Sequence, residues 1–144
     1  MSQLHQASCV AIGQRAVVIE GAPGSGKSSL TLALIDRGAL LIGDDAVALE
    51  LRLDETGSDR LLASPPPNIA GLLEIRNVGL VSFQTARAVP VALVLRLDRN
   101  APRFIDAAER VALAGASIPL VRLWPDSPVL HLRAEAALKA HGLG

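Results

Sequence analysis

The amino-acid sequence predicts an α/β fold in which a mostly parallel central sheet is extended by antiparallel hairpin strands. Its 144 residues are the length of one ordinary domain, and half of them are hydrophobic, which is enough to bury a core. A short β-branched run at 16–19 leads into a glycine-rich loop and then into helically spaced apolar residues. Strand, loop and helix in this order are typical of α/β proteins, so we expect residues 1–144 to form one domain.

The first elements follow from turn and cap signals. Strands are expected at 8–12 and 16–19, on either side of a turn at Gly13 and Gln14. The helix after the glycine-rich loop should end near Arg37, because Gly38 is a natural C-cap. The apolar run 39–42 is then expected to return as a parallel strand.

The second half of the chain is expected to consist mainly of strands. Alternation of apolar and polar residues predicts a half-exposed strand at 47–53, a turn at 54–59 and a hairpin partner at 60–63. The run Pro-Pro-Pro-Asn at 65–68 predicts a stiff, exposed loop. The remaining expectations are a strand at 89–97, an edge hairpin of 110–113 and 118–123 or a helix over 107–114, and a last helix capped by Ser127 and Pro128 that runs to about His141.

Residues 21–28 carry the clearest chemical signal. They read Gly-Ala-Pro-Gly-Ser-Gly-Lys-Ser, the G-x-x-x-x-G-K-S pattern of the P-loop. Glycines let several N–H groups point at one phosphate, and the following helix directs its positive dipole end to the same place. Lys27 would meet the β- and γ-phosphates, and Ser28 would ligate Mg²⁺. The pattern predicts binding of ATP and Mg²⁺, with contacts from Gly21, Ala22, Pro23, Gly24, Ser25, Gly26, Lys27, Ser28 and Ser29.

Two carboxylates, Asp44 and Asp45, follow the expected strand at 39–42. In open α/β sheets, ligands bind at the carboxyl ends of the strands. One carboxylate there is suited to the Mg²⁺ shell, and the other to orienting or deprotonating an attacking hydroxyl. Asp44 is therefore a candidate metal ligand and Asp45 a candidate base, although a merely polar turn is the alternative interpretation.

The unbroken stretch from the P-loop to Gly43-Asp44-Asp45 resembles the catalytic domain of the HPr kinase/phosphorylase family. Residues 71–80, GLLEIRNVGL, are similar to that family's G-x-x-E-I-R-G-x-G signature, and the similarity covers about residues 4–97. The family phosphorylates a serine of HPr, a small phosphocarrier protein of the sugar phosphotransferase system, and also carries out phosphorolysis of that phosphoserine. The resemblance thus implies a P-loop kinase domain with an HPr-like phosphocarrier as its partner.

The resemblance also implies roles for individual residues. Lys27 would contact the transferring phosphate, and Ser28 and Glu74 would be Mg²⁺ ligands. Asp45 would take the proton of the seryl hydroxyl, since a hydroxyl is a poor nucleophile without an adjacent base. His5 lies about where the family has its catalytic histidine, and would assist near Asp45.

Several departures from the family pattern bear on the reverse reaction. Ser29 stands where the family has a glutamate, and Asn77 replaces the glycine after E-I-R. The late Gly-Arg-Asn motif, which is tied to dephosphorylation, is replaced by about 125–130, which contains no arginine. The N-terminal domain of long family members has no counterpart in this sequence. We expect a short form in which kinase activity is retained and phosphorolysis is weak.

Composition excludes other classes of partner. The formal net charge is zero and only three residues are aromatic, which argues against nucleic acid binding. No apolar run approaches the roughly 20 residues of a membrane span, and no signal peptide is recognisable. The single Cys9 suits a reducing compartment, so a cytoplasmic location is expected. Near-zero charge and the hexamers of the family lead us to expect a homo-oligomer.

Two alternatives to a protein serine kinase stay open. The P-loop and its carboxylates do not fix the acceptor, so a small molecule is possible. The departures at Ser29, Asn77 and 125–130 would also permit a regulatory module that senses ATP without transferring phosphate. The loop at 65–68, beside the signature, is a candidate docking surface that would favour a protein acceptor.

Overall fold

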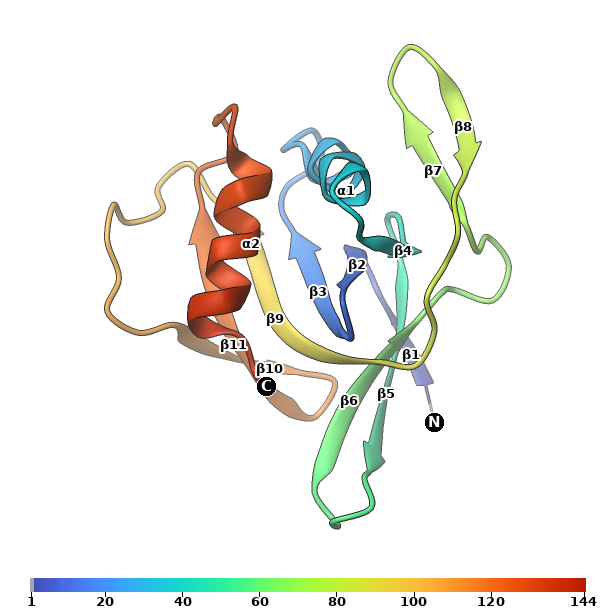
Figure 1. Cartoon of the computed structure of the whole chain (residues 1–144), viewed down its shortest axis with the longest axis vertical. Helices are drawn as coiled ribbons and strands as arrows, with labels where there is room; N and C mark the ends of the chain where they lie inside the picture. The colour runs from blue at the N-terminus through green and yellow to red at the C-terminus, as the bar shows by residue number, and fades with distance from the viewer. Residues whose placement is uncertain (1) are drawn as a thin grey trace.

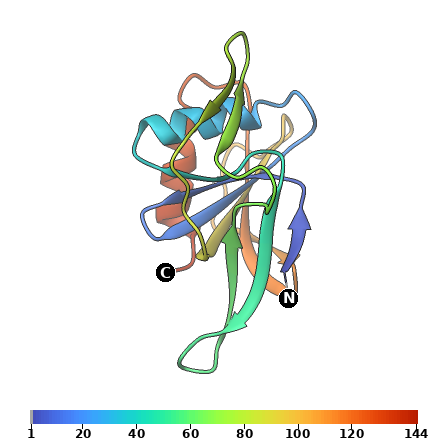
Figure 2. The ribbon, with the colours of Figure 1, turned by 90° about the vertical axis from the view of Figure 1, so that its right-hand side faces the viewer.

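The computed structural model describes residues 2–144 and confirms the α/β class (Figure 1). A large curled sheet carries two helices on one face, and a small separate hairpin projects beside the first helix (Figures 1 and 2). The strands are β1 (Ser2–His5), β2 (Ser8–Ile12), β3 (Arg15–Glu20), β4 (Leu40–Gly43), β5 (Val47–Leu53), β6 (Asp59–Ser64), β7 (Leu72–Ile75), β8 (Gly79–Ser82), β9 (Val89–Leu97), β10 (Glu109–Leu113) and β11 (Ala116–Leu123); the helices are α1 (Lys27–Asp36) and α2 (Leu130–His141).

The large sheet has the strand order β1-β5-β6-β9-β3-β2-β4, and β11 also pairs with β9 and carries β10 at its edge. The expectation of a mostly parallel sheet is wrong, because among the described strands only the pairs β3·β9 and β9·β11 are parallel. Three of the neighbouring pairs, β2–β3, β5–β6 and β10–β11, are hairpins, and a hairpin makes its two strands antiparallel.

The strand at 39–42 forms as β4, but its pairing differs from the expectation. It pairs antiparallel with β2, which in turn is antiparallel to β3. Two reversals leave β4 running in the same direction as β3, with β2 between them. The carboxyl ends of β3 and β4 therefore still meet at one edge of the sheet, where the P-loop and Asp44 follow them.

The core consists of two layers, one on each face of the sheet. Alternate residues of β3 separate them, with Val17 and Ile19 facing the helices and Ala16 and Val18 facing the other side. Leu30, Leu34 and Leu138 bring α1 and α2 onto the first face. The second face is covered because the sheet curls, so that Leu49, Leu61 and Ile118 close over it.

One local alternative is decided and two expectations change. The edge hairpin is confirmed and the helix over 107–114 is wrong, since β10 pairs with β11 around the turn at Gly115. Pro65 and Pro66 are buried, so only the second half of the proline loop is exposed. Helix α2 begins at Leu130 behind Val129, and the Ser127 hydroxyl accepts the Val129 N–H at 3.2 Å, before the helix rather than at its cap. Over residues 2–144, no helix is long and apolar enough to cross a membrane.

Candidate active site

The P-loop motif lies between the end of β3 and the start of α1, as the sequence predicts. Gly24 and Gly26 have φ values of 78° and 101°, a left-handed conformation that side chains disfavour. A turn forms in the middle of the loop, where the Ser25 N–H donates to the Ala22 carbonyl at 3.0 Å. These two glycines of the motif therefore adopt the positive φ values for which the P-loop pattern requires glycine.

The Lys27 side chain folds back across the loop. Its ammonium donates to the carbonyl of Gly21 at 2.8 Å and to that of Ala22 at 3.3 Å. These acceptors are neutral, so anionic phosphate oxygens would be stronger partners for the same donors. The ammonium is thus held at the mouth of the loop by contacts that a phosphate can replace.

The start of α1 fits an anion. Gly26 occupies the N-cap without a side-chain cap, and the first turn contains no acidic residue. The first N–H groups of the helix and its positive dipole end are therefore free of a competing carboxylate. The Ser25 hydroxyl is buried without a hydrogen-bond partner among the described residues, which is costly unless a ligand satisfies it. The N–H groups at the start of α1 and the Ser25 hydroxyl are therefore suited to the oxygens of a phosphate chain.

Asp44 is the point at which three segments meet. One carboxylate oxygen accepts the Ser28 hydroxyl at 2.8 Å and the Ser8 hydroxyl at 3.3 Å, and the other accepts the Glu74 N–H at 3.4 Å. The fold therefore brings together the P-loop serine, the first acid of the pair and the signature segment, which are distant in sequence. Sequence analysis did not find Ser8, because a serine that opens an apolar strand gives no signal of its own.

These residues also fit Mg²⁺. The ion is usually bound by one or two carboxylates together with substrate phosphates and water, and in P-loop proteins by the loop Ser and a nearby Asp. Ser28 and Asp44 offer that pair, and the backbone of Glu74, on β7, contacts the Asp44 carboxylate. Within residues 2–144, no cluster of three or more His, Cys, Asp or Glu side chains is present, so an ion here would depend on oxygens from the nucleotide.

Asp45 sits in the sharp bend between β4 and β5 with a φ of 67° and an exposed side chain. A left-handed conformation is uncommon for residues other than glycine, although Asp and Asn tolerate it best. The bend is tight, because a Cβ on Gly43 would collide with the Ala46 carbonyl. The backbone therefore presents the Asp45 carboxylate to solvent at the edge where the P-loop lies.

His5 does not bond to Asp45 among the contacts of the described residues. Its backbone pairs with Val47, two residues beyond Asp45, but its Nε2 lies 2.8 Å from an oxygen of Glu20. The other Glu20 oxygen accepts two bonds from Arg96, at 2.8 and 3.1 Å. Sequence analysis missed Glu20 and Arg96, which face each other on the parallel strands β3 and β9 and carry no motif.

The carboxyl of Glu20 has a perturbed pKa. Partial burial alone would raise it, but hydrogen bonds from Arg96 and His5 outweigh that effect, so its pKa lies below the usual range. Glu20 is directly followed by the first P-loop glycine, so the cluster anchors the entry to the loop.

This anchoring predicts a pH dependence of stability. A carboxyl whose pKa is lowered by folding contributes stability above its unfolded value, and loses it as the pH falls through the folded value. Wild type should therefore be more stable than Glu20→Gln at pH 7, and the gap should shrink as the pH falls below about 4.3. Urea unfolding of both proteins from pH 7 to pH 3 measures this, and a gap that is constant with pH would contradict it.

The signature segment forms the hairpin β7–β8, separate from the large sheet. Asn77 lies in its turn with a φ of 71°, next to a hydrogen bond from the Val78 N–H to the Ile75 carbonyl. Turns of this kind select Gly or Asn at that position. The departure from the family's glycine therefore preserves the backbone conformation.

The two arginines that flank residues 125–130, where the late motif is missing, are already engaged. Arg122 donates to Glu109 at 2.8 Å and to Asp98 at 3.1 Å. Arg133 lies over the ring of Trp124, 5.8 Å from its centroid. Neither side chain is directed to the P-loop by these contacts.

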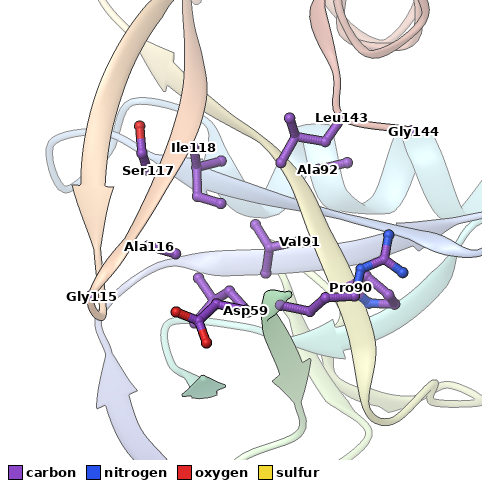
Figure 3. A pocket seen from close by; sticks show the side chains of 12 residues that line it. Asp59, Pro90, Val91, Ala92, Gly115, Ala116, Ser117, Ile118, Leu143 and Gly144 are labelled. Atoms are coloured by element: carbon purple, nitrogen blue, oxygen red, sulfur yellow. The ribbon is translucent and has the colours of Figure 1, made fainter. Parts of the chain in front are cut away.

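Two hollows of the surface differ in their position relative to the P-loop. One adjoins the P-loop and is lined by Ser25, Gly26 and Ser29 on one side and by residues 125–128 and His131 on the other. The second, shown in Figure 3, is lined by Pro90–Ala92, the β10–β11 turn and the C-terminal residues. It lies at the amino end of β9, whereas the P-loop lies at the carboxyl end, so only the first hollow belongs to the site.

The fold and site together define a mixed α/β domain built around a P-loop motif. The chain belongs to the family described as the HPr serine kinase C-terminal domain, whose model matches residues 1–92. It is 33% identical over 105 residues to an HPr kinase/phosphorylase of Nitrosomonas europaea, covering 68% of this chain and 31% of the relative. It is 40% identical over 91 residues to an HPr kinase/phosphorylase of Cupriavidus necator, covering 58% of this chain and 27% of the relative.

The comparison of folds agrees with this family assignment. The structure of the HPr(Ser) kinase/phosphatase from Coxiella burnetii superposes with a TM-score of 0.79 at 26% identity, covering 95% of this chain and 88% of that one. The family resemblance inferred from the motifs is therefore confirmed. The chain spans less than a third of the length of these two curated relatives, so their activity comes to it only as a proposal.

Proposed function

We propose that this domain is an ATP- and Mg²⁺-dependent serine kinase that acts on an HPr-like phosphocarrier protein. The observation that carries the proposal is the convergence on Asp44, where the P-loop Ser28 and the signature residue Glu74 meet. Family membership supports the same reaction, because the relatives are HPr kinase/phosphorylases by name.

The geometry of the site supports the following roles. The loop N–H groups and Lys27 would bind the phosphates of ATP, exchanging the Gly21 and Ala22 carbonyls for phosphate oxygens. The nucleoside would lie in the hollow between the loop and residues 125–128. Bound Mg²⁺, held by Ser28 and Asp44 with Glu74 close by, would neutralise charge on the β- and γ-phosphates.

The acceptor serine would approach Asp45. Its hydroxyl oxygen forms the new bond to the γ-phosphorus as the bond to the β-phosphate oxygen breaks, and its proton passes to the Asp45 carboxylate. The exposed bend at Asp45 suits an acceptor that comes from outside as part of another protein. His5 would assist the reaction through its hydrogen bond to Glu20, the residue directly before the P-loop.

The test is incubation with labelled ATP and a purified HPr-like protein, followed by mapping of the phosphosite. Transfer to one serine supports the proposal. Transfer only to small molecules would favour the metabolite kinase, and ATP binding without any transfer would favour the regulatory module. A kinase with this acceptor would work in the cytoplasm. The expected homo-oligomer is tested separately, by measuring the native mass of the protein.

We expect phosphorolysis to be weak compared with the kinase reaction. Phosphate must be gathered next to the phosphoserine, but Arg122 is neutralised by two acids. The Asp126 carboxylate borders the P-loop hollow, and Arg99 offsets its charge across an exposed contact of 3.7 Å. The measurement is pyrophosphate release from seryl-phosphorylated phosphocarrier with millimolar phosphate. A reverse rate equal to the forward rate would contradict this expectation.

A further inference from the structure

The outer face of the β7–β8 hairpin carries apolar side chains that the fold does not use. Leu73 and Val81 face each other on the inner side, where Leu73 is fully buried. Leu80 on the outer side is 69% exposed, and Val78 in the turn is 70% exposed. Leu80 and Val78 therefore offer aliphatic surface to solvent on this projecting element.

The position of Leu80 restricts what can cover it. Leu80 is the direct cross-strand partner of Glu74, so their Cβ atoms lie about 5 Å apart on the same face. The Glu74 N–H reaches Asp44, which in turn holds Ser28. Any molecule seated on Leu80 therefore lies next to the Glu74 carboxylate, on the strand whose backbone contacts Asp44.

A second copy of this chain on that face would obstruct the site, because the acceptor must approach the same edge. The occupant that fits is the acceptor itself. The hairpin has no strand pairing with the large sheet. Its placement depends on the buried Leu73, on the bond from the Glu74 N–H to Asp44 and, just after β8, on backbone bonds that Leu41 makes with residues 84 and 86.

We propose that the outer face of the hairpin, Leu72, Leu80 and the turn residue Val78, docks an apolar surface patch beside the phosphorylatable serine of the acceptor protein. This inference rests on the proposed kinase function. Docking supplies affinity for the acceptor at a place that does not touch the nucleotide. It also favours a protein over a metabolite, since the acceptor must offer apolar surface to the hairpin as well as a hydroxyl to Asp45.

The test compares two leucines of equal exposure. Leu80→Ser alters the proposed surface, and Leu53→Ser alters the tip of the β5–β6 hairpin, where Leu53 is also 69% exposed. We expect Leu80→Ser to raise the KM for the phosphocarrier about 10-fold with unchanged calorimetric affinity for ATP, and Leu53→Ser to change neither.

Each other outcome has a distinct meaning. If wild type phosphorylates the carrier and the two variants behave alike, the docking surface is overturned and the kinase function stands. If wild type transfers nothing to any protein, both proposals fail. If Leu80→Ser lowers the native mass while Leu53→Ser does not, the hairpin is an interface between copies, and docking is overturned.

Discussion

Replacing Asp45 with asparagine should lower the rate of phosphoryl transfer at least about 100-fold, the usual scale for loss of a general base. Asparagine is nearly isosteric and adopts the left-handed conformation readily, so the bend at φ 67° should persist. The variant therefore removes the proton acceptor without disturbing the backbone. The measurement is single-turnover transfer of labelled phosphate to the phosphocarrier.

The control is Asp106→Asn, which removes an exposed carboxylate in the segment between β9 and β10. It should transfer phosphate at the wild-type rate, and both variants should bind ATP with wild-type affinity. A tenfold loss or less for Asp45→Asn would mean that another group takes the seryl proton. In that case Asp45 serves only the geometry of the bend.

The P-loop and its helix could be predicted from sequence because the motif fixes both chemistry and local conformation. Gly24 and Gly26 adopt the positive φ values that the pattern implies, and α1 ends at Asp36, one residue before the expected end at Arg37. Local signals of this kind need no knowledge of distant partners. The same holds for the hairpins β2–β3 and β5–β6, whose turns are encoded between their strands.

Sheet order was less predictable, because pairing depends on contacts between distant segments. The run at 39–42 was expected to pair in parallel, but β2 separates it from β3. This error did not affect the predicted site, because β4 runs in the same direction as β3 and still places Asp44 beside Ser28. Direction, rather than adjacency, is what the chemistry requires of that strand.

The cluster around Glu20 shows what one sequence cannot reveal. His5 was assigned to Asp45 by its place in the family pattern, yet its nearest acid is Glu20. Glu20 and Arg96 are separated by 76 positions, and only the parallel register of β3 and β9 brings them together. Charged residues at strand ends are common and usually solvated, so the sequence gives no reason to pair these two.

The chain contains two lysines, which provide a matched test of the P-loop. Lys27→Ala should weaken ATP binding about 10- to 100-fold, since hydrogen bonds from a charged donor to phosphate are worth about 1.5–3 kcal/mol. Lys139→Ala, at an exposed position in the last turn of α2, should leave the affinity unchanged. Calorimetric titration with ATP and Mg²⁺ measures both.

Removing Lys27 also removes its bonds to the Gly21 and Ala22 carbonyls, so loosening of the loop must be separated from loss of charge. Lys27→Arg keeps a cation that can reach phosphate, although with different geometry, and should retain more affinity than Lys27→Ala. Loop loosening alone would weaken both variants equally, because neither restores the lysine's own contacts. Unchanged ATP affinity in Lys27→Ala, with wild-type thermal stability, would mean that residues 21–28 do not bind the nucleotide.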